Sequence, residues 1–255
     1  MANAVKTKEN GKVAVLNMDM FEQDAGAGLN NLGQEDLALP FLKVLSKLSD
    51  ELDDIEGAKA GDVLNTVTNN IYKGKLNVVP CAYQRRFIQW QPRGSGTGAP
   101  VAIYTPTEKI PETNRSSEDN KEYLTDGSGD YIEQTCQWYV KVIEEDGTAS
   151  NALIPMKSTQ LKKSRKWMSM IMSRQMTGKK GPFTPPMYSH VYTLTTVPEE
   201  NNKGKWHGWE MSLDKQVDDL NLYNSAKTFA ESVDKGDVNV KHTQDGDKDG
   251  DNVPF

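Results

Sequence analysis

The stretch from Leu76 to Trp90 combines aromatic and arginine side chains at a spacing typical of a β-strand. Side chains alternate between the two faces of a strand, so we expect Tyr83, Arg85 and Phe87 on one face. Aromatic rings can stack on the bases of single-stranded nucleic acid, and guanidinium groups bind phosphates. Any one such ring in a strand is more often a packing residue, but the group as a whole predicts contact with a single strand.

The stretch from Tyr131 to Glu145 alternates in the same way. We expect Tyr131, Tyr139 and Lys141 on its outward face, where Tyr139 and Lys141 could contact nucleic acid. The opposite face is apolar and should point into the core. It carries Ile132, Cys136, Trp138, Val140 and Val142.

A basic helix is expected from Thr159 to Met176, within a segment from Met156 to Pro198 that contains no acidic residue. A solvated helix face normally mixes charge signs, so an acid-free cationic face favours phosphate contact over an anionic membrane or a calmodulin-like partner. The apolar face comprises Leu161, Met168, Ile171, Met172 and Met176. The candidate phosphate contacts opposite it are Lys162, Lys163, Lys166 and Arg174.

The charge of the chain is distributed unevenly. Its net charge of −6 at first argues against phosphate binding. However, the acid-free segment carries eight Lys and Arg residues, whereas residues 245–255 carry four Asp and one Lys. This asymmetry is typical of a basic binding surface combined with an acidic interaction tail.

Several classes of site have no support in the sequence. Cys81 and Cys136 form no CxxC pair, which favours a reducing cytoplasm over a disulfide scaffold. No stretch approaches the length of a membrane span, the histidines lack HExxH spacing and the glycines form no phosphate-binding loop. The EF-hand-like run from Asp245 to Gly250 lacks its closing Glu. We therefore expect no catalysis, metal, cofactor or membrane contact.

The order of the expected elements is strands, a helix and two further strands. Strands are expected at 63–68, 76–90, 131–145 and 149–156, then at 187–197 and 205–213, with a last helix at 214–233. A helical turn is expected at 40–48, and a long mobile loop at 91–129. This order predicts a β-rich α+β fold: an OB-fold-like five-stranded antiparallel barrel with a helix between its third and fourth strands. Another α+β domain with an antiparallel sheet is the alternative.

Three regions follow from this order. Residues 1–34 should form a flexible N-terminal arm, and residues 35–234 the OB-fold-like domain. Residues 235–255 should form a disordered acidic tail.

The last residues, Asp251-Asn-Val-Pro-Phe255, follow a run of acids. They resemble the C-terminal tip of bacterial single-stranded-DNA-binding proteins, which close on Asp-Asp-Ile-Pro-Phe, and the acidic tip with terminal Phe of T7-like phage helix-destabilising proteins. The match covers about the last eleven residues. The stretches Leu39–Leu45 and Val79–Phe87 are similar to sequences from tailed phages.

The resemblance implies a phage protein that coats single-stranded DNA without strong sequence preference during replication and recombination. The tail would recruit a polymerase, helicase or nuclease through Asp249, Asp251, Pro254 and Phe255, with the ring in an apolar pocket and the carboxylates near basic groups. A strand-annealing recombination protein and a phage structural or assembly protein are the alternatives. The chain could also form homo-oligomers.

Overall fold

The computed structural model describes residues 6–9, 12–15, 18–30, 37–201 and 204–242. The chain divides into two units, Met1–Leu37 and Ala38–Phe255. The first unit contains an antiparallel hairpin of β1 (Lys6–Glu9) and β2 (Lys12–Val15), followed by a short helix α1 (Met18–Gln23). Flexibility of residues 1–34 stays a prediction.

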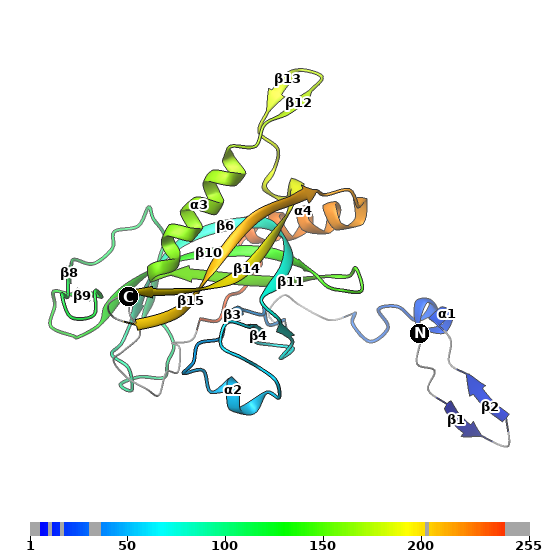
Figure 1. Cartoon of the computed structure of the whole chain (residues 1–255), viewed down its shortest axis with the longest axis horizontal. Helices are drawn as coiled ribbons and strands as arrows, with labels where there is room; N and C mark the ends of the chain where they lie inside the picture. Colours follow the sequence, from blue (N-terminus) through cyan, green and yellow to red (C-terminus); the bar gives the residue numbers. More distant parts are fainter. Residues whose placement is uncertain (1–5, 10–11, 16–17, 31–36, 202–203, 243–255) are drawn as a thin grey trace. The chain divides into compact units, whose positions relative to one another are not determined.

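The second unit is built around five long antiparallel strands (Figure 1). Their spatial order is β15, β14, β6, β10, β11. Because β14 returns to lie beside β6 after β10 and β11, the first four strands form a Greek key. In the described part of the chain no pairing joins β11 to β15, so the sheet is not a closed barrel. The strands are β6 (Lys75–Trp90), β10 (Tyr131–Ile143), β11 (Ala149–Lys157), β14 (His190–Asn201) and β15 (Gly204–Gln216).

These five strands were all expected from the sequence, and so were the hairpins that join β10 to β11 and β14 to β15. The turn between β10 and β11 has Gly147 at φ 85°, and the Asp146 carboxylate accepts a hydrogen bond from the Thr148 amide at 2.9 Å. The β-rich α+β class with antiparallel sheets is therefore confirmed.

A second, smaller sheet is formed by three short strands that precede β6 in the chain. β3 (Leu42–Val44), β4 (Val63–Asn65) and β5 (Ile71–Tyr72) form a separate three-stranded sheet, and α2 spans Glu51–Asp54. The helical turn expected at 40–48 is wrong, because Leu42 and Leu45 are buried and β3 pairs with β4. Pairing with a distant strand overrides the local preference for helix.

The expected loop at 91–129 also contains strands. β7 (Ala102–Tyr104) pairs with β6, and β8 (Thr113–Arg115) pairs with β9 (Glu122–Leu124), which joins the start of β10. The expectation of an unstructured loop is therefore wrong at these short segments, because each has a pairing partner.

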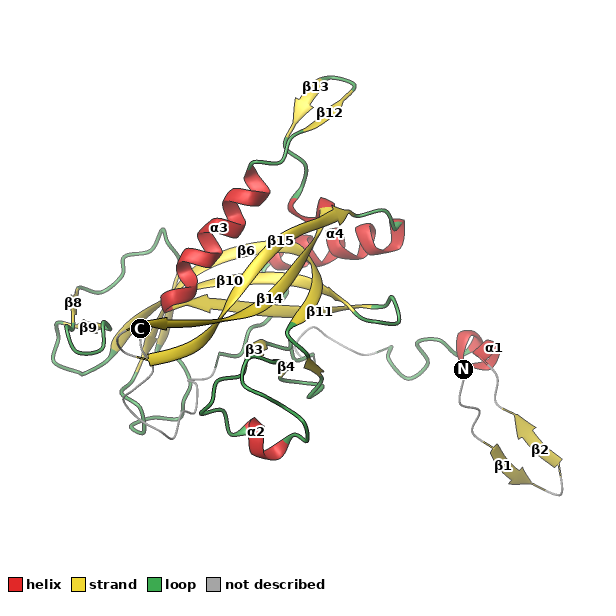
Figure 2. Ribbon diagram, viewed as in Figure 1, coloured by secondary structure: helices red, strands yellow, loops and turns green. Residues whose placement is uncertain are grey.

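Each face of the central sheet is covered by one helix (Figure 2). α3 (Leu161–Met172) packs on the face that carries Trp138, and α4 (Leu220–Lys235) packs on the face that carries Tyr139. The expected C-terminal helix is present but starts after Asp219, whose carboxylate accepts a hydrogen bond from the Leu222 amide at 2.7 Å. It starts later than expected because β15 continues to Gln216.

Candidate nucleic-acid interface

Helix α3 is fixed by two tryptophans. Trp167 stacks on Trp138 of β10 with ring centroids 4.2 Å apart, and the Trp138 indole donates a hydrogen bond to Ser164 Oγ at 2.9 Å. The buried residues of α3 are Ser164, Trp167 and Ile171. Met172, expected on the packed face, is 60% exposed instead, because the large Trp167 ring turns a different side of the helix towards the core.

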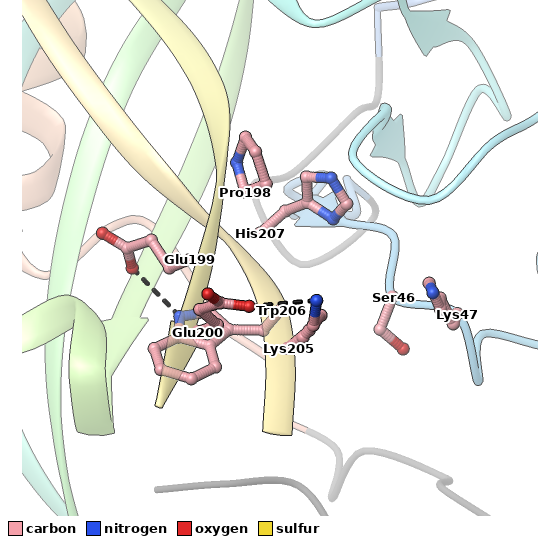
Figure 3. A pocket seen from close by; sticks show the side chains of 8 residues that line it. All are labelled: Ser46, Lys47, Pro198, Glu199, Glu200, Lys205, Trp206 and His207. Atoms are coloured by element: carbon pink, nitrogen blue, oxygen red, sulfur yellow. Dashed lines mark hydrogen bonds and ion pairs between the residues drawn. The ribbon is translucent and has the colours of Figure 1, made fainter. Parts of the chain in front are cut away.

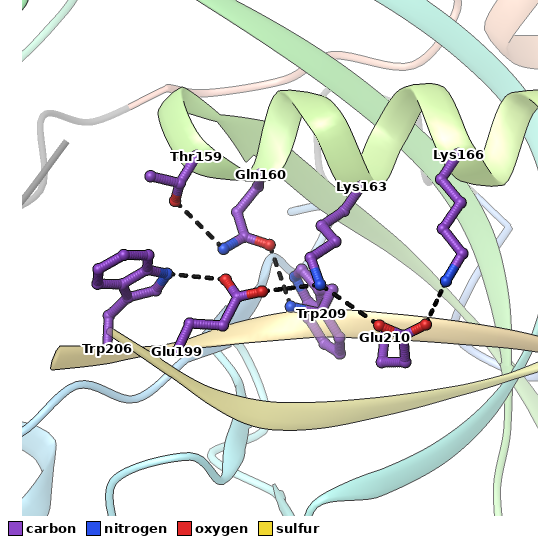
Figure 4. A network of polar contacts seen from close by, with 8 residues as sticks. All are labelled: Thr159, Gln160, Lys163, Lys166, Glu199, Trp206, Trp209 and Glu210. Carbon is purple, nitrogen blue, oxygen red and sulfur yellow. Dashed lines mark hydrogen bonds and ion pairs between the residues drawn. The ribbon is translucent and has the colours of Figure 1, made fainter. Parts of the chain in front are cut away.

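Two of the candidate lysines on α3 are paired with acids (Figure 4). Lys163 Nζ lies 2.7 Å from the Glu199 carboxylate and 3.3 Å from that of Glu210, and Lys166 pairs with Glu210. The hydrogen bond to Glu199 raises the pKa of Lys163, and the hydrogen bond from Lys166 lowers the pKa of Glu210. These lysines therefore hold α3 to β14 and β15, and each already has an acidic partner.

Four other cations of the acid-free segment are exposed. Lys162 and Arg165 lie on α3, and Lys179 and Lys180 lie in the turn between β12 (Met176–Gly178) and β13 (Gly181–Phe183). This hairpin projects from the end of α3, away from the sheet (Figure 1). None of the four forms an ion pair with another described residue, and we call them the basic surface.

Arg174 lies apart from the basic surface. It is half-buried, and its Nε has no hydrogen-bond partner among the described atoms. Burial, with a smaller contribution from the Arg174 charge, lowers the pKa of His190. Arg174 therefore sits near the start of β14 rather than with the exposed cations.

The three candidates on β6 lie at different depths. Tyr83 is half-buried against Trp138, with ring centroids 4.9 Å apart, and its hydroxyl donates to Cys136 Sγ at 3.1 Å. Burial raises the pKa of Tyr83 to about 12. Arg85 is exposed, and its guanidinium carbon lies 5.8 Å from the centre of the half-buried Phe87 ring. Arg85 and Phe87 are thus the members of this set that reach the surface.

The outward face expected for β10 is covered. Tyr131, Tyr139 and Lys141 are only 6%, 2% and 8% exposed, so the prediction that they face solvent is wrong. Phe229 of α4 lies against both residues. Its ring centroid is 6.2 Å from that of Tyr139 and 5.8 Å from Lys141 Nζ. The expected core face is confirmed, since all of its members are buried: Ile132, Cys136, Trp138, Val140 and Val142.

A cavity of about 440 Å³ lies beside the β14–β15 hairpin (Figure 3). Sequence reasoning missed it, because its walls come from two segments far apart in the chain. The one local signal was a tryptophan between a lysine and a histidine in β15. The lining residues are Ser46, Lys47, Pro198, Glu199, Glu200, Lys205, Trp206 and His207.

A family model described as "Pam3 phage gp34-like protein" matches residues 7–239. The chain belongs to the Pam3 phage gp34-like family. The predicted phage origin is thereby supported. Neither the curated proteins nor the solved structures include a match to this gp34-like chain.

The predicted tail contacts of the gp34-like chain, Asp249, Asp251, Pro254 and Phe255, lie outside the described residues. His242 is the last residue that the structure describes. Its Nε2 lies 2.6 Å from Gln137 Nε2, and its ring meets the Phe41 ring edge-on, with ring centroids 5.8 Å apart. The described residues include no group of three or more metal-ligating side chains. No helix of the described portion is long and apolar enough to cross a membrane.

Proposed function

We propose that this phage protein binds single-stranded DNA without strong sequence preference during phage DNA replication and recombination, and that it does so without catalysis. The observation that carries the proposal is the basic surface of Lys162, Arg165, Lys179 and Lys180. These exposed cations lie in a segment with no acidic residue and form no ion pair within the described part of the chain. Such a surface binds phosphates with release of counterions, whatever the base sequence.

The strand order supports an OB-fold-like architecture for this function. OB-folds are partly open five-stranded Greek-key barrels that bind oligonucleotides. Here β15 adds a fifth strand beside the Greek key, and α3, which follows the third long strand, contacts both β11 and β15. Helix α3 thus spans the two strands whose pairing would close a barrel.

Base stacking is assigned to Phe87 and phosphate contact to Arg85, because both reach the surface of β6. Tyr104 of β7 pairs across from Phe87 and places a second half-buried ring on the same strand face. Tyr83, in contrast, packs against Trp138 and donates a hydrogen bond to Cys136, and Tyr139 and Lys141 are covered by α4. Partly exposed rings beside cations favour a single strand, whose unpaired bases can stack on them.

The acidic residues 245–255 are proposed to recruit replication or recombination proteins such as a polymerase, helicase or nuclease. Their charge would repel DNA, whereas Phe255 supplies an apolar anchor for a protein pocket. The protein is proposed to work in the host-cell cytoplasm.

The test is a titration with oligo-dT at several salt concentrations. We expect the variant with Lys162, Arg165, Lys179 and Lys180 all changed to Gln to bind more weakly. Each lost phosphate contact should lower the slope of log K against log salt by about 0.7. A Lys227→Gln/Lys235→Gln variant on α4 is the matched control and should behave like the wild type.

Absence of wild-type binding to oligo-dT would contradict the proposal and favour a structural or assembly role. An unchanged slope in the quadruple variant would remove the basic surface from the DNA contact. Binding accompanied by annealing of complementary strands would identify the strand-annealing alternative.

A further inference from the structure

The cavity beside the β14–β15 hairpin contains the one tryptophan of the five that is not buried. Trp90, Trp138, Trp167 and Trp209 are all at most 4% exposed, whereas Trp206 is partly open to the cavity. Ser46 and Lys47 face the hairpin from across the cavity (Figure 3). Its volume of about 440 Å³ lies within the range of small-molecule sites.

The Trp206 indole is held in one orientation. Its Nε1 donates a hydrogen bond to Glu199 at 3.0 Å, and Lys163 holds the same carboxylate at 2.7 Å (Figure 4). A Cβ at Gly208 would lie 2.4 Å from Glu199 Oε2, so a larger residue there would displace this carboxylate from its present position. A ring fixed in advance loses little conformational freedom when a ligand stacks on it.

The charges around the cavity favour an anion near Lys47 and Lys205. Glu199 is already paired with Lys163. Glu200 pairs with Lys205 at 3.0 Å, but these side chains are 68% and 74% exposed, so the pair is weak and Lys205 can exchange it for another anion. Lys47 is exposed and forms no ion pair with any residue that the structure describes.

One further wall is fixed by close packing. Gly61 has φ 95°, and a Cβ there would lie 2.8 Å from the His207 ring. The backbone at Gly61 therefore lies directly against His207, which ties the segment after Lys47 to the hairpin. The cavity has an ordered frame, with an aromatic ring and two lysines around it.

We propose that this cavity binds one nucleotide of a single DNA strand, with its base stacked on Trp206 and its phosphate near Lys47 and Lys205. The inference rests on the proposed single-strand binding and adds a specific base site to it. A fixed aromatic ring beside exchangeable cations is the arrangement that single-strand-binding surfaces use, since every base has a π-face. An acidic peptide could form ion pairs with Lys47 and Lys205, but its carboxylates would not stack on Trp206.

The experiment follows tryptophan fluorescence during titration of the full chain with oligo-dT. Because the other four indoles are buried, quenching should come from Trp206 and should disappear in Trp206→Phe. Trp206→Phe should keep most of the affinity, whereas Trp206→Ala should lose about 5- to 160-fold. Lys47→Ala should weaken binding by several-fold and lower the salt slope by about 0.7. Lys227→Ala on α4 is the matched control.

The outcomes separate the two proposals. If wild type binds oligo-dT in an anisotropy assay but shows no quenching, and Lys47→Ala and Trp206→Ala bind normally, the base site is refuted while single-strand binding stands. If wild type binds no oligo-dT, both proposals fail. Should Trp206→Ala fail to fold, Lys47→Ala and the quenching still decide, because Lys47 is exposed and has no described ion-pair partner to lose. Binding of an acidic peptide that is lost in Lys47→Ala, together with no quenching of Trp206 by oligo-dT, would favour a peptide site and overturn the inference.

Discussion

The indole of Trp167 in α3 stacks on that of Trp138 in β10, with ring centroids 4.2 Å apart and planes 20° from parallel. Tyr83 and Tyr192 pack around this pair, at 4.9 Å from Trp138 and 5.8 Å from Trp167. The aromatic cluster joins the helix to the sheet. It therefore determines which side of α3 is left for the exposed cations Lys162 and Arg165.

Replacing Trp167 with Ala should lower the free energy of unfolding by about 3–5 kcal/mol, because it leaves a cavity against Trp138. Ser164→Ala should cost about 1–3 kcal/mol, because the buried Trp138 Nε1 loses its acceptor. Urea denaturation measures both values, with exposed Ser169→Ala as the control on the same helix. Equal stability of all three variants would contradict this orientation of α3.

For α3, some features could be predicted from the sequence and others could not. The helix, its acid-free charge and the long strands on either side were predictable, because periodicity and charge are local properties. The buried face was predicted from the aliphatic residues and methionines, without Trp167. The pairing of Lys163 and Lys166 depends on acids of β14 and β15, which no local pattern places beside α3.

The outward face of β10 illustrates the same limit. Alternation correctly separated Tyr139 and Lys141 from the core face of Trp138. It could not show that α4, far along the chain, covers the second face and leaves both residues buried. The β3 strand was missed for a similar reason, since its partner β4 begins only at Val63.

This difference in depth between Phe87 and Tyr139 predicts separate effects. Phe87→Ala should weaken oligo-dT binding by about 1–3 kcal/mol with little change in stability. Tyr139→Phe should leave binding unchanged but lose the hydrogen bond from the hydroxyl to Gln84, at a cost in stability of about 1 kcal/mol. Oligo-dT titration and urea denaturation of both variants provide the check. If Tyr139→Phe weakened oligo-dT binding and Phe87→Ala did not, DNA would contact the sheet face that α4 covers instead.

The ion pairs of Glu210 predict a loss of stability in acid. Its pKa is lowered in the folded state, first by the hydrogen bond from Lys166. The ionised form is therefore favoured on folding, so its stabilisation is present above the ordinary Glu pKa and is lost as the pH falls through the lowered value. Glu210→Gln should flatten this part of the stability profile, measured by urea denaturation between pH 7 and pH 3. Glu231→Gln on α4 is the control, and an identical change in both variants would contradict the prediction.

His242 predicts a second pH effect. Burial, with the charges of Lys157 and Arg86, lowers its pKa from 6.5 to about 4. The His242 ring is thus neutral while it is packed against Gln137. Below pH 6.5, protonation favours the state in which the segment that carries His242 has left this contact and its ring is in water. At about 1.4 kcal/mol per pH unit, docking of this segment should weaken by about 2 kcal/mol at pH 5.

Hydrogen exchange of residues 237–242 at pH 7 and pH 5 measures that release. After correction for the intrinsic exchange rate, we expect these amides of wild type to be less protected at pH 5 than at pH 7, and those of His242→Gln to be equally protected at both. An NMR titration of His242 close to its ordinary pKa would contradict the buried, neutral state.

The segment after His242 provides the last prediction. Residues 245–255 carry four Asp and one Lys and close on Phe255. Their negative charge repels phosphate, so deleting them should leave oligo-dT affinity unchanged or higher, most clearly at low salt. Deleting Phe255 alone should instead abolish capture of replication or recombination proteins from infected-cell extract, since the ring is the apolar anchor.

A variant with all four Asp residues of this segment changed to Asn tests the contribution of their charge separately from that of the Phe255 ring. It should reproduce the DNA affinity of the full deletion while it still captures partners through Phe255, though more weakly. Oligo-dT titration and pull-down are performed on the same protein preparations. Reduced DNA affinity together with an unchanged set of captured proteins would show that the tail contacts DNA, and the assignment of a protein-recruiting role to Phe255 would then be abandoned.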